Sequence, residues 1–313
     1  MNTEAHLSVS SRAQQLISDS ILVDMTAANS PLHPIFKISV GFEPWVEKYR
    51  RAGITWASMT VNADFTKNAG DMIKGFAANR RYILEHPQDY ILVTSTAAVR
   101  RAKIESKLAV NFNFQGSMPL EGDVNLVEPM KTLGVGHMLL TYNDKNLAGG
   151  GSHDPDDPGL SPLGRDLVRE MNRVGMIVDC THTSCRSALE ICELSSRPVI
   201  YSHSSARALR DHARNINDDQ IRACAATGGV IGISGVGLFL SEDYNDISAE
   251  IIFRHIDYVA ALVGHEHVGL GLDYIPGQDD PKPEGHNILA EYTHKYGEDQ
   301  YPPMNHMAIA SPD

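Results

Sequence analysis

The chain alternates short apolar runs with stretches of helical period, and this alternation constrains its fold more than any other feature. Eight runs have the length and composition of strands: 21–24, 54–61, 108–114, 137–142, 176–180, 198–201, 230–234 and 268–273. Strands that alternate with helices form parallel sheets through right-handed crossovers, and eight such repeats close into a barrel. The sequence therefore predicts an α/β fold of the (β/α)8 (TIM barrel) type, with a doubly wound open sheet as the alternative.

Two helices are marked most clearly. Ser161 can cap the first, Pro162 suits its first turn, and Gly175 is placed to end it. The apolar stripe between them consists of Leu163, Leu167, Val168 and Met171. The second helix is expected over 247–264, where apolar residues again recur at helical spacing.

No shift in composition divides the repeats, so we expect one barrel domain over residues 1–313. Two long segments, 148–159 and 275–313, follow predicted strands, and a barrel carries its active site at the carboxyl ends of its strands. The segment 275–313 is rich in proline and allows one short helix near 287–296. We therefore expect it to be irregular, with an early chain end in place of the last barrel helix.

Charge and composition narrow the class of partner. The chain has 27 Lys+Arg against 39 Asp+Glu, a formal charge of −12, and no basic cluster. Such a surface repels phosphate backbones and anionic lipid, which argues against nucleic acid or a membrane as partner. The first twenty residues lack a secretory signal and no apolar run is long enough to span a bilayer, so we expect a cytoplasmic protein with a small-molecule substrate.

Polar residues at the ends of the predicted strands are the candidates for chemistry, because a barrel brings these ends to one mouth. They are Asp24, Gln115, Tyr142, Asn143, Asp179, His182, His203, Ser234 and Asp273. His182 and His203 follow neighbouring strands, so their imidazoles could bind one cation, with Asp273 as a further ligand or a general base. The alternative is that both histidines only hydrogen-bond loop backbone.

Three arginines, Arg207, Arg210 and Arg214, follow the sixth predicted strand. A guanidinium beside the mouth can bind a substrate carboxylate through two parallel hydrogen bonds. We assign that role to Arg214, against the alternative that all three form salt bridges on a helix surface.

Several stretches together resemble the membrane dipeptidase (renal dipeptidase) family, peptidase family M19. They are 159–165 (GLSPLGR), 170–176 (EMNRVGM), 179–182 (DCTH), 201–207 (YSHSSAR), 212–215 (HARN) and 267–273 (HVGLGLD), in the family's order. The resemblance implies a (β/α)8 barrel of the metal-dependent hydrolase, amidohydrolase-like type. It also implies that His182 and His203 ligate zinc and that Arg214 grips the carboxylate of a dipeptide. Asp273 then matches the carboxylate at the other metal, which assists proton transfer.

The chain departs from the family pattern at several positions, all of them at the predicted mouth of the barrel. Thr26 and Ala28 stand where the family has a histidine and an aspartate that bind a zinc ion, and Gln115 stands where it has the glutamate that bridges two ions. Tyr142 replaces the histidine that contacts the reacting carbonyl. We therefore expect one zinc ion rather than two, or another divalent metal, on His182 and His203, with Gln115 or Asp273 and water completing its shell.

The predicted function is hydrolysis of a dipeptide or a small carboxylate-bearing amide by a dipeptidase-family enzyme. Asp273 would transfer the proton and Tyr142 would donate to the developing oxyanion, while Arg214 and Asn143 bind the substrate. The main alternative is a degenerate member that binds an amino-acid-like metabolite without hydrolysing it. Metal-free lyase or isomerase chemistry by Asp273 and Tyr142 is the third. A homodimer is a further expectation, common for this architecture.

Overall fold

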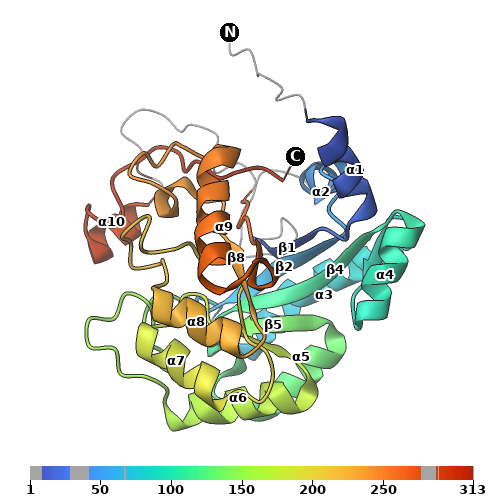
Figure 1. Ribbon diagram of the computed structural model, residues 1–313. Helices are drawn as coiled ribbons and strands as arrows, with labels where there is room; N and C mark the ends of the chain where they lie inside the picture. The colour runs from blue at the N-terminus through green and yellow to red at the C-terminus, as the bar shows by residue number, and fades with distance from the viewer. Residues whose placement is uncertain (1–8, 29–41, 67, 276–286, 288, 313) are drawn as a thin grey trace.

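The strands form one parallel sheet that closes into a barrel (Figure 1). The computed structural model describes residues 9–28, 42–66, 68–275, 287 and 289–312. The strands are β1 (Val23–Ala27), β2 (Trp56–Ala63), β3 (Tyr90–Leu92), β4 (Leu108–Gln115), β5 (Val135–Leu139), β6 (Ile177–Asp179), β7 (Ile200–Tyr201), β8 (Val230–Ile233) and β9 (Val268–Leu270). Their order is β2-β1-β9-β8-β7-β6-β5-β4-β3, and the additional pairing of β2 with β4 closes a ring of eight strands.

Strand β3 lies outside this ring. It pairs with residues 108–110 at the start of β4, whereas the later part of β4, residues 112–114, pairs with β5. The expected closed barrel of eight strands is therefore confirmed, and β3 is an addition that the sequence pattern did not reveal. Several strands are shorter than expected, and the run 198–201 contributes only Ile200–Tyr201 to the sheet.

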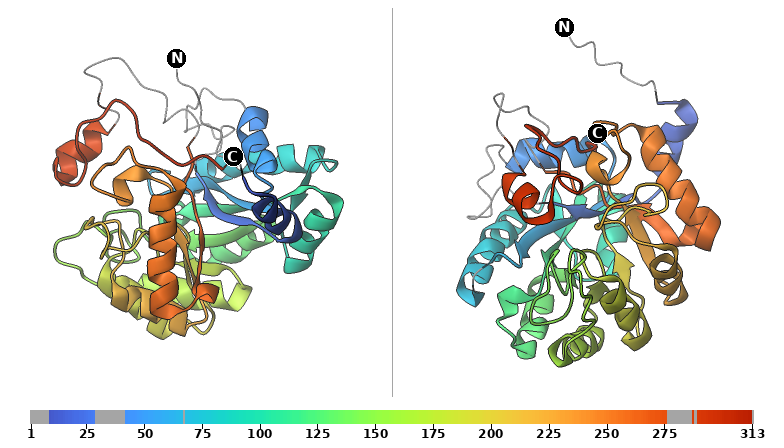
Figure 2. Two further views of the ribbon diagram at one scale, coloured as in Figure 1. Left: turned by 45° about the horizontal axis from the view of Figure 1, so that its top comes forward. Right: turned by 90° about the vertical axis from the view of Figure 1, so that its left-hand side faces the viewer.

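Helices cover the outside of the barrel. They are α1 (Ser11–Asp19), α2 (Phe42–Arg51), α3 (Ala69–Glu85), α4 (Thr96–Glu105), α5 (Val127–Leu133), α6 (Pro162–Val174), α7 (Cys185–Leu194), α8 (Asp218–Ala226), α9 (Ala249–Val263) and α10 (Ala290–Tyr296), with 3-10 turns η1 (Met118–Leu120), η2 (Val124–Leu126), η3 (Gly237–Phe239) and η4 (His265–His267). The right-hand view of Figure 2 shows helices around the strands, and the C-terminal segment with α10 lying on the face toward the viewer.

The two helices expected from the sequence form as predicted. The Ser161 hydroxyl accepts a hydrogen bond from the Gly164 N–H at 3.1 Å, and Gly175 ends α6 with a φ of 75° in the left-handed region. The buried face of α6 carries Leu167, Val168 and Met171, three of the four residues of its predicted apolar stripe. Helix α9 follows the N-cap Ser248 and is followed by Gly264.

The barrel interior contains a chain of hydrogen bonds between buried polar side chains. The Gln115 side-chain amide donates to the Thr60 hydroxyl at 3.1 Å, and that hydroxyl donates to the side-chain oxygen of Asn113 at 3.0 Å. The Asn113 amide in turn donates to the Ser58 hydroxyl oxygen at 3.1 Å. At these positions the neighbouring strands β2 and β4 thus carry polar rather than apolar side chains, and each of these side chains has a partner.

This chain continues to β6 through His137. Its Nε2 lies 2.8 Å from the Ser58 hydroxyl and its Nδ1 lies 3.0 Å from an Asp179 carboxylate oxygen. Burial raises the pKa of Asp179, but the hydrogen bond and charge of His137 outweigh it and bring the pKa to about 2. Asp179 also accepts hydrogen bonds from the backbone N–H groups of Thr181 and Ser202, which fixes the loops after β6 and β7.

The C-terminal segment is only partly described. Residues 276–286, 288 and 313 of the expected irregular segment 275–313 lie outside the described residues. Within the described remainder, the short helix expected near 287–296 is present as α10. The assignment of the whole chain to a single domain stays a prediction.

Candidate active site

Two imidazoles meet at the carboxyl ends of β6 and β7. The Nε2 atoms of His182 and His203 lie 3.0 Å apart, and both side chains are buried. Burial holds the pKa of each imidazole well below its ordinary value, and the nearby guanidinium of Arg214 lowers both further. Both rings are therefore neutral at pH 7, which is the form that binds a metal ion.

The outer nitrogen of each ring is held by a polar neighbour. His182 Nδ1 lies 2.6 Å from the Asn143 side-chain oxygen, which can only accept, so the His182 proton sits on Nδ1 and Nε2 keeps its lone pair. His203 Nδ1 lies 2.8 Å from the Ser202 hydroxyl and 3.1 Å from the Thr26 hydroxyl. Such partners fix the orientation of metal-binding histidines in other proteins.

The hydroxyl partners of His203 allow two arrangements of its proton. With the proton on Nε2, His203 donates a hydrogen bond to His182. With the proton on Nδ1, both Nε2 atoms carry a lone pair, and their separation of 3.0 Å is close to that of two nitrogen ligands of one cation. The pair therefore fits two positions in the shell of a single cation.

A complete set of protein ligands is not formed. Among the described residues, no group of three or more His, Cys, Asp or Glu side chains converges at distances that would hold a metal ion. Thr26, which stands at a ligand position of the resembled family, instead contacts His203 through its hydroxyl, and Ala28 is buried without a ligating atom. The residues present do not fit a two-metal centre.

Asp273 and Gln115 form a second group beside the first. Gln115 at the end of β4 hydrogen-bonds the Asp273 carboxyl, and the Asp273 backbone N–H donates to the Thr26 carbonyl oxygen at 3.0 Å. Burial raises the pKa of Asp273 to about 7; the charge of Arg214 and the bond from Gln115 oppose this rise, whereas the nearby Asp24 adds to it. A carboxyl group that titrates near neutral pH is suited to general acid and base catalysis.

Arg214 is a buried cation with unused hydrogen-bonding capacity. Its Nη2 donates to the His203 carbonyl oxygen at 3.4 Å, and its guanidinium lies 5.3 Å from the centre of the Phe239 ring. Nη1 has no hydrogen-bond partner among the described atoms. Arg214 and His182 line the same cavity of about 170 Å³. A buried guanidinium with a free N–H is costly unless a ligand carboxylate completes it.

The other two arginines each have a contact, although the Nε of each is buried without a partner among the described atoms. Arg210 forms an ion pair with Glu242 at 2.5 Å, and Arg207, which lines the same cavity as Arg214, donates to the Ala213 carbonyl oxygen at 3.0 Å. Ser234, another candidate from the sequence, accepts a hydrogen bond from the Val236 N–H at 3.3 Å, and no other side-chain contact of Ser234 is found among the described residues. Arg214 is the only one of the three arginines that is buried, and its role as the carboxylate ligand stays a prediction.

Tyr142 lies against the histidine pair. Its ring stacks on His182 with centroids 4.1 Å apart and an interplanar angle of 23°, and its hydroxyl lies 3.4 Å from the Tyr292 hydroxyl of α10. Burial raises the pKa of Tyr142 well above its ordinary value, so its hydroxyl keeps its proton. Tyr301 also reaches this region, where Asn143 bonds its hydroxyl. Tyr292 and Tyr301 were not among the predicted site residues, because the short helix expected near 287–296 does not by itself indicate which side chains reach the barrel mouth.

Three of the predicted site residues adopt a strained backbone conformation. Asn143, His182 and Asp273 have φ values of 59°, 65° and 59°, in the left-handed region that disfavours residues with a Cβ. Such strain concentrates at functional sites, where the surrounding structure enforces it. The occurrence of this strain at three predicted site residues supports the assignment of a site, and no sequence pattern indicated it.

A closed parallel barrel whose strand ends carry a histidine pair, a buried arginine and a carboxyl group of neutral pKa has the architecture of the amidohydrolase-like barrel enzymes. The profile of the family described as membrane dipeptidase (peptidase family M19) matches residues 47–292. The chain belongs to this family.

Similar proteins agree with that assignment. The chain is 30% identical over 216 residues to an uncharacterised dipeptidase of Schizosaccharomyces pombe, covering 68% of this chain and 52% of the other. It is 35% identical over 178 residues to dipeptidase tcpJ of Claviceps purpurea, covering 56% and 42%. The crystal structure of an amidohydrolase from Pseudomonas aeruginosa superposes with a TM-score of 0.79 at 30% identity, covering 96% of this chain and 86% of that one.

The chain spans about half the length of the curated relatives it matches. Within its described residues, no helix combines the length and the apolar character that crossing a membrane requires.

Proposed function

We propose that this chain hydrolyses a dipeptide or a small amide that carries a carboxylate. The observation that carries the proposal is the free Nη1 of buried Arg214, whose guanidinium also contacts the backbone of His203, one of the two paired histidines. A substrate carboxylate on Arg214 would complete the hydrogen bonding of the guanidinium and hold the scissile bond beside the histidines. Membership of a dipeptidase family supports the same reaction class.

We further propose one divalent cation, zinc in the first instance, on the Nε2 atoms of His182 and His203. The fixed Nδ1 atoms and the low pKa values of both rings support this assignment. Gln115 or Asp273, together with water, would complete the shell. When bound, the cation supplies Lewis-acid chemistry. A catalytic zinc site with three protein ligands would need Gln115 or Asp273 in addition to the two histidines.

The remaining steps belong to residues of the chain. Asp273, with a pKa of about 7, accepts the proton of the attacking water and returns it to the leaving amine. The Tyr142 hydroxyl stays protonated and donates to the oxygen on which charge develops. Asn143 acts on the reaction through His182 Nδ1 and is a positioning residue, whereas a direct contact of Asn143 with substrate remains a prediction.

A dipeptide hydrolysis assay with zinc added tests this proposal. His203→Ala should abolish turnover, and the control His265→Ala, at an exposed histidine, should not. Arg214→Met should raise KM at least about tenfold by removing a charged hydrogen bond, while Arg169→Met on the surface of α6 leaves KM unchanged. Turnover that survives His203→Ala would exclude the histidine pair from catalysis.

The second candidate is a protein that binds an amino-acid-like metabolite and does not hydrolyse it. The absence of a three-ligand group among the described residues favours it, as do Thr26 and Ala28 at family ligand positions. A thermal-shift screen with amino acids and betaines, run beside the dipeptide assay, separates the two functions. Stabilisation by a ligand without turnover on any dipeptide supports the binding protein, and turnover that depends on His203 eliminates it.

The cytoplasmic location, the homodimer and the absence of nucleic-acid and membrane partners remain predictions from the sequence.

A further inference from the structure

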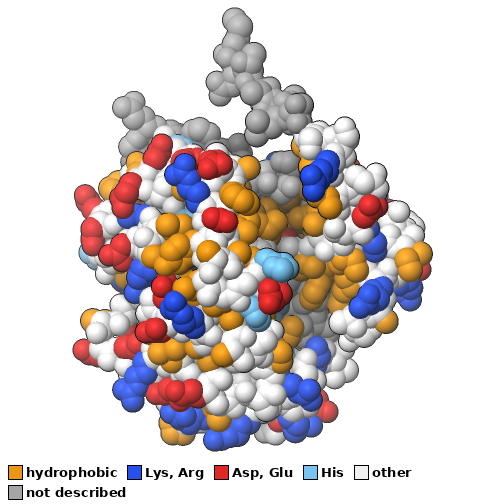
Figure 3. All heavy atoms as spheres, viewed as in Figure 1, with side chains coloured by type: hydrophobic (Ala, Val, Ile, Leu, Met, Phe, Trp, Pro, Cys, Tyr) orange, Lys and Arg blue, Asp and Glu red, His pale blue; other side chains and the backbone are white. Residues whose placement is uncertain are grey.

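A cavity of about 440 Å³ lies at the amino ends of the barrel strands, at the opposite end from the histidine pair. Most of its wall is apolar and consists of strand residues such as Val23, Met25, Trp56, Ile177, Ile200 and Leu270. In Figure 3, apolar side chains surround a hollow near the middle of the face shown. Its volume falls within the range of roughly 300–1,000 Å³ that small-molecule sites occupy.

Small residues line the cavity at positions where barrel interiors usually hold large branched ones. Two of them are Gly269 and Ser58. A Cβ added at Gly269 would lie 3.5 Å from both the Met25 methyl and the Val230 Cγ1, which is ordinary van der Waals contact. The chain thus leaves space at Gly269 that a side chain could fill without meeting backbone.

Two described residues that line this cavity have basic side chains, Lys131 and His137. Both ring nitrogens of His137 already have partners, Ser58 and Asp179. Lys131 is half-buried in the last turn of α5, and no described carboxylate lies within ion-pair distance of its ammonium group. Burial lowers its pKa. The first turn of α4 also faces the cavity through Ser95 and Thr96, and the Ser95 side chain does not cap the helix. Uncapped N–H groups at a helix start favour an anion.

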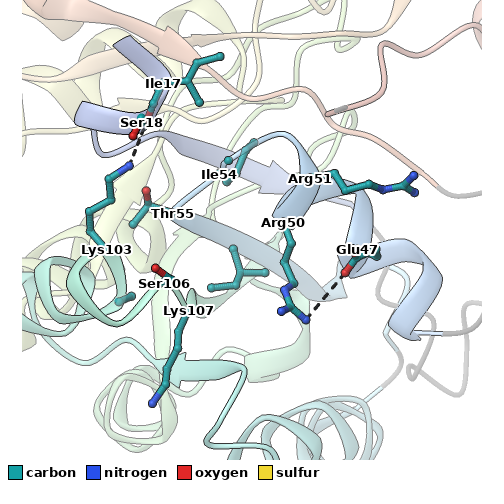
Figure 4. A pocket seen from close by; sticks show the side chains of 13 residues that line it. Ile17, Ser18, Glu47, Arg50, Arg51, Ile54, Thr55, Lys103, Ser106 and Lys107 are labelled. Atoms are coloured by element: carbon teal, nitrogen blue, oxygen red, sulfur yellow. Dashed lines mark hydrogen bonds and ion pairs between the residues drawn. The ribbon is translucent and has the colours of Figure 1, made fainter. Parts of the chain in front are cut away.

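A second cavity offers a comparison, because the basic residues named below have partners there. It has about 480 Å³ and lies between α1, α2 and α4 (Figure 4). There Arg50 pairs with Glu47 at 3.8 Å, and Lys103 donates to the Ile17 carbonyl oxygen at 3.2 Å. Arg50 thus pairs within α2 and Lys103 joins α4 to α1, whereas Lys131 has no described partner.

We propose that the cavity at the amino ends of the strands binds a small apolar monocarboxylate. The apolar wall would bury its hydrocarbon part, and Lys131 with the first turn of α4 would receive its carboxylate at the rim. This site is independent of the proposed hydrolytic function, because it lies at the other end of the barrel.

Calorimetric titration with octanoate tests the proposal on the whole protein. Octanoate should bind, whereas octanol and octylamine should bind at least about tenfold more weakly, since neither makes a charge-assisted hydrogen bond to Lys131. Lys131→Gln should weaken octanoate binding about tenfold, and the control Lys74→Gln, at an exposed lysine on α3, should not change it. Lys131→Glu should reverse the preference toward octylamine.

Two further variants fix the location of binding. Gly269→Val narrows the cavity and should weaken octanoate binding, provided that its circular dichroism and melting match the parent; Gly269→Ala is the milder variant if valine unfolds the protein. Arg214→Met should leave octanoate binding intact, since that arginine lies at the mouth. Octanoate binding that is unchanged in Gly269→Val, disappears in Arg214→Met, or equals that of octanol would overturn the proposal, as would the absence of any heat.

Discussion

Asp24 offers a sharp test of the electrostatics at the barrel mouth. Its side chain is fully buried, and one carboxylate oxygen accepts hydrogen bonds from the Thr26 and Leu272 N–H groups at 3.1 and 3.0 Å. The other oxygen has no partner among the described atoms. Burial raises the pKa of Asp24 from 3.8 to about 7, although the two backbone bonds oppose the rise. Replacing Asp24 by asparagine keeps the accepting oxygen and removes the charge.

The sign and size of the effect follow from this pKa. Because the folded state holds the Asp24 proton more tightly than the unfolded state, the contribution of Asp24 to stability is full below about pH 4 and is lost as the pH rises through about 7. Between about pH 5 and pH 8 the parent should lose about 3 kcal/mol through this group, taking about 1.4 kcal/mol for each of two pH units. Asp24→Asn should not show this loss.

Urea unfolding followed by circular dichroism, in buffer with a chelator at several pH values, measures the difference. The diagnostic quantity is the slope against pH, because burying an unpaired amide N–H adds a cost of about 1–3 kcal/mol that is the same at every pH. Asp166→Asn, at an exposed aspartate on α6, is the matched control. Equal slopes for the parent and Asp24→Asn would refute the reasoning.

The same substitution should change catalysis in a related way. The charge of Asp24 raises the pKa of Asp273, so Asp24→Asn should move the acid limb of the turnover profile to lower pH. An unchanged limb would mean that Asp273 is not the group whose ionisation limits turnover.

Three further outcomes are expected. Asn143→Ala should lower kcat about ten- to hundredfold by releasing His182 Nδ1, with a smaller change in KM, which steady-state kinetics measures. Gly151→Ala should destabilise the protein by about 1–3 kcal/mol, seen as a lower Tm, because its Cβ would lie 2.2 Å from the Asn143 carbonyl oxygen. Asp179→Asn should cost about 1–3 kcal/mol in urea unfolding near neutral pH, because it weakens the buried hydrogen bonds that the carboxylate accepts from His137 and from the Thr181 and Ser202 N–H groups. In the parent, whose Asp179 pKa is about 2, the stability from this pair should persist above about pH 4 and be lost as the pH falls toward 2.

Much of the fold could be predicted because its signals are local. The cap at Ser161 and the glycine at Gly175 bound α6 in the sequence as they do in the structure. Strand β3 was missed because only three residues, Tyr90–Leu92, pair with β4, too few to show a period. The meeting of His182 and His203 followed from topology, since neighbouring parallel strands end at one face.

The finer geometry of the site could not be read in the same way. The partners of His203 Nδ1, Thr26 and Ser202, depend on side-chain directions across strands that are distant in sequence. The contact of Tyr142 with Tyr292 joins residues 150 positions apart, and no periodic pattern marks the segment around α10. Long-range packing decides such contacts, and a single sequence carries no local signal for it.

Zinc stoichiometry tests the central claim most directly. Equilibrium dialysis of the chelator-treated protein against zinc should give one bound ion per chain, lost in His182→Ala and in His203→Ala and retained in His265→Ala. Two ions per chain, or a single ion that survives removal of either imidazole, would contradict the account.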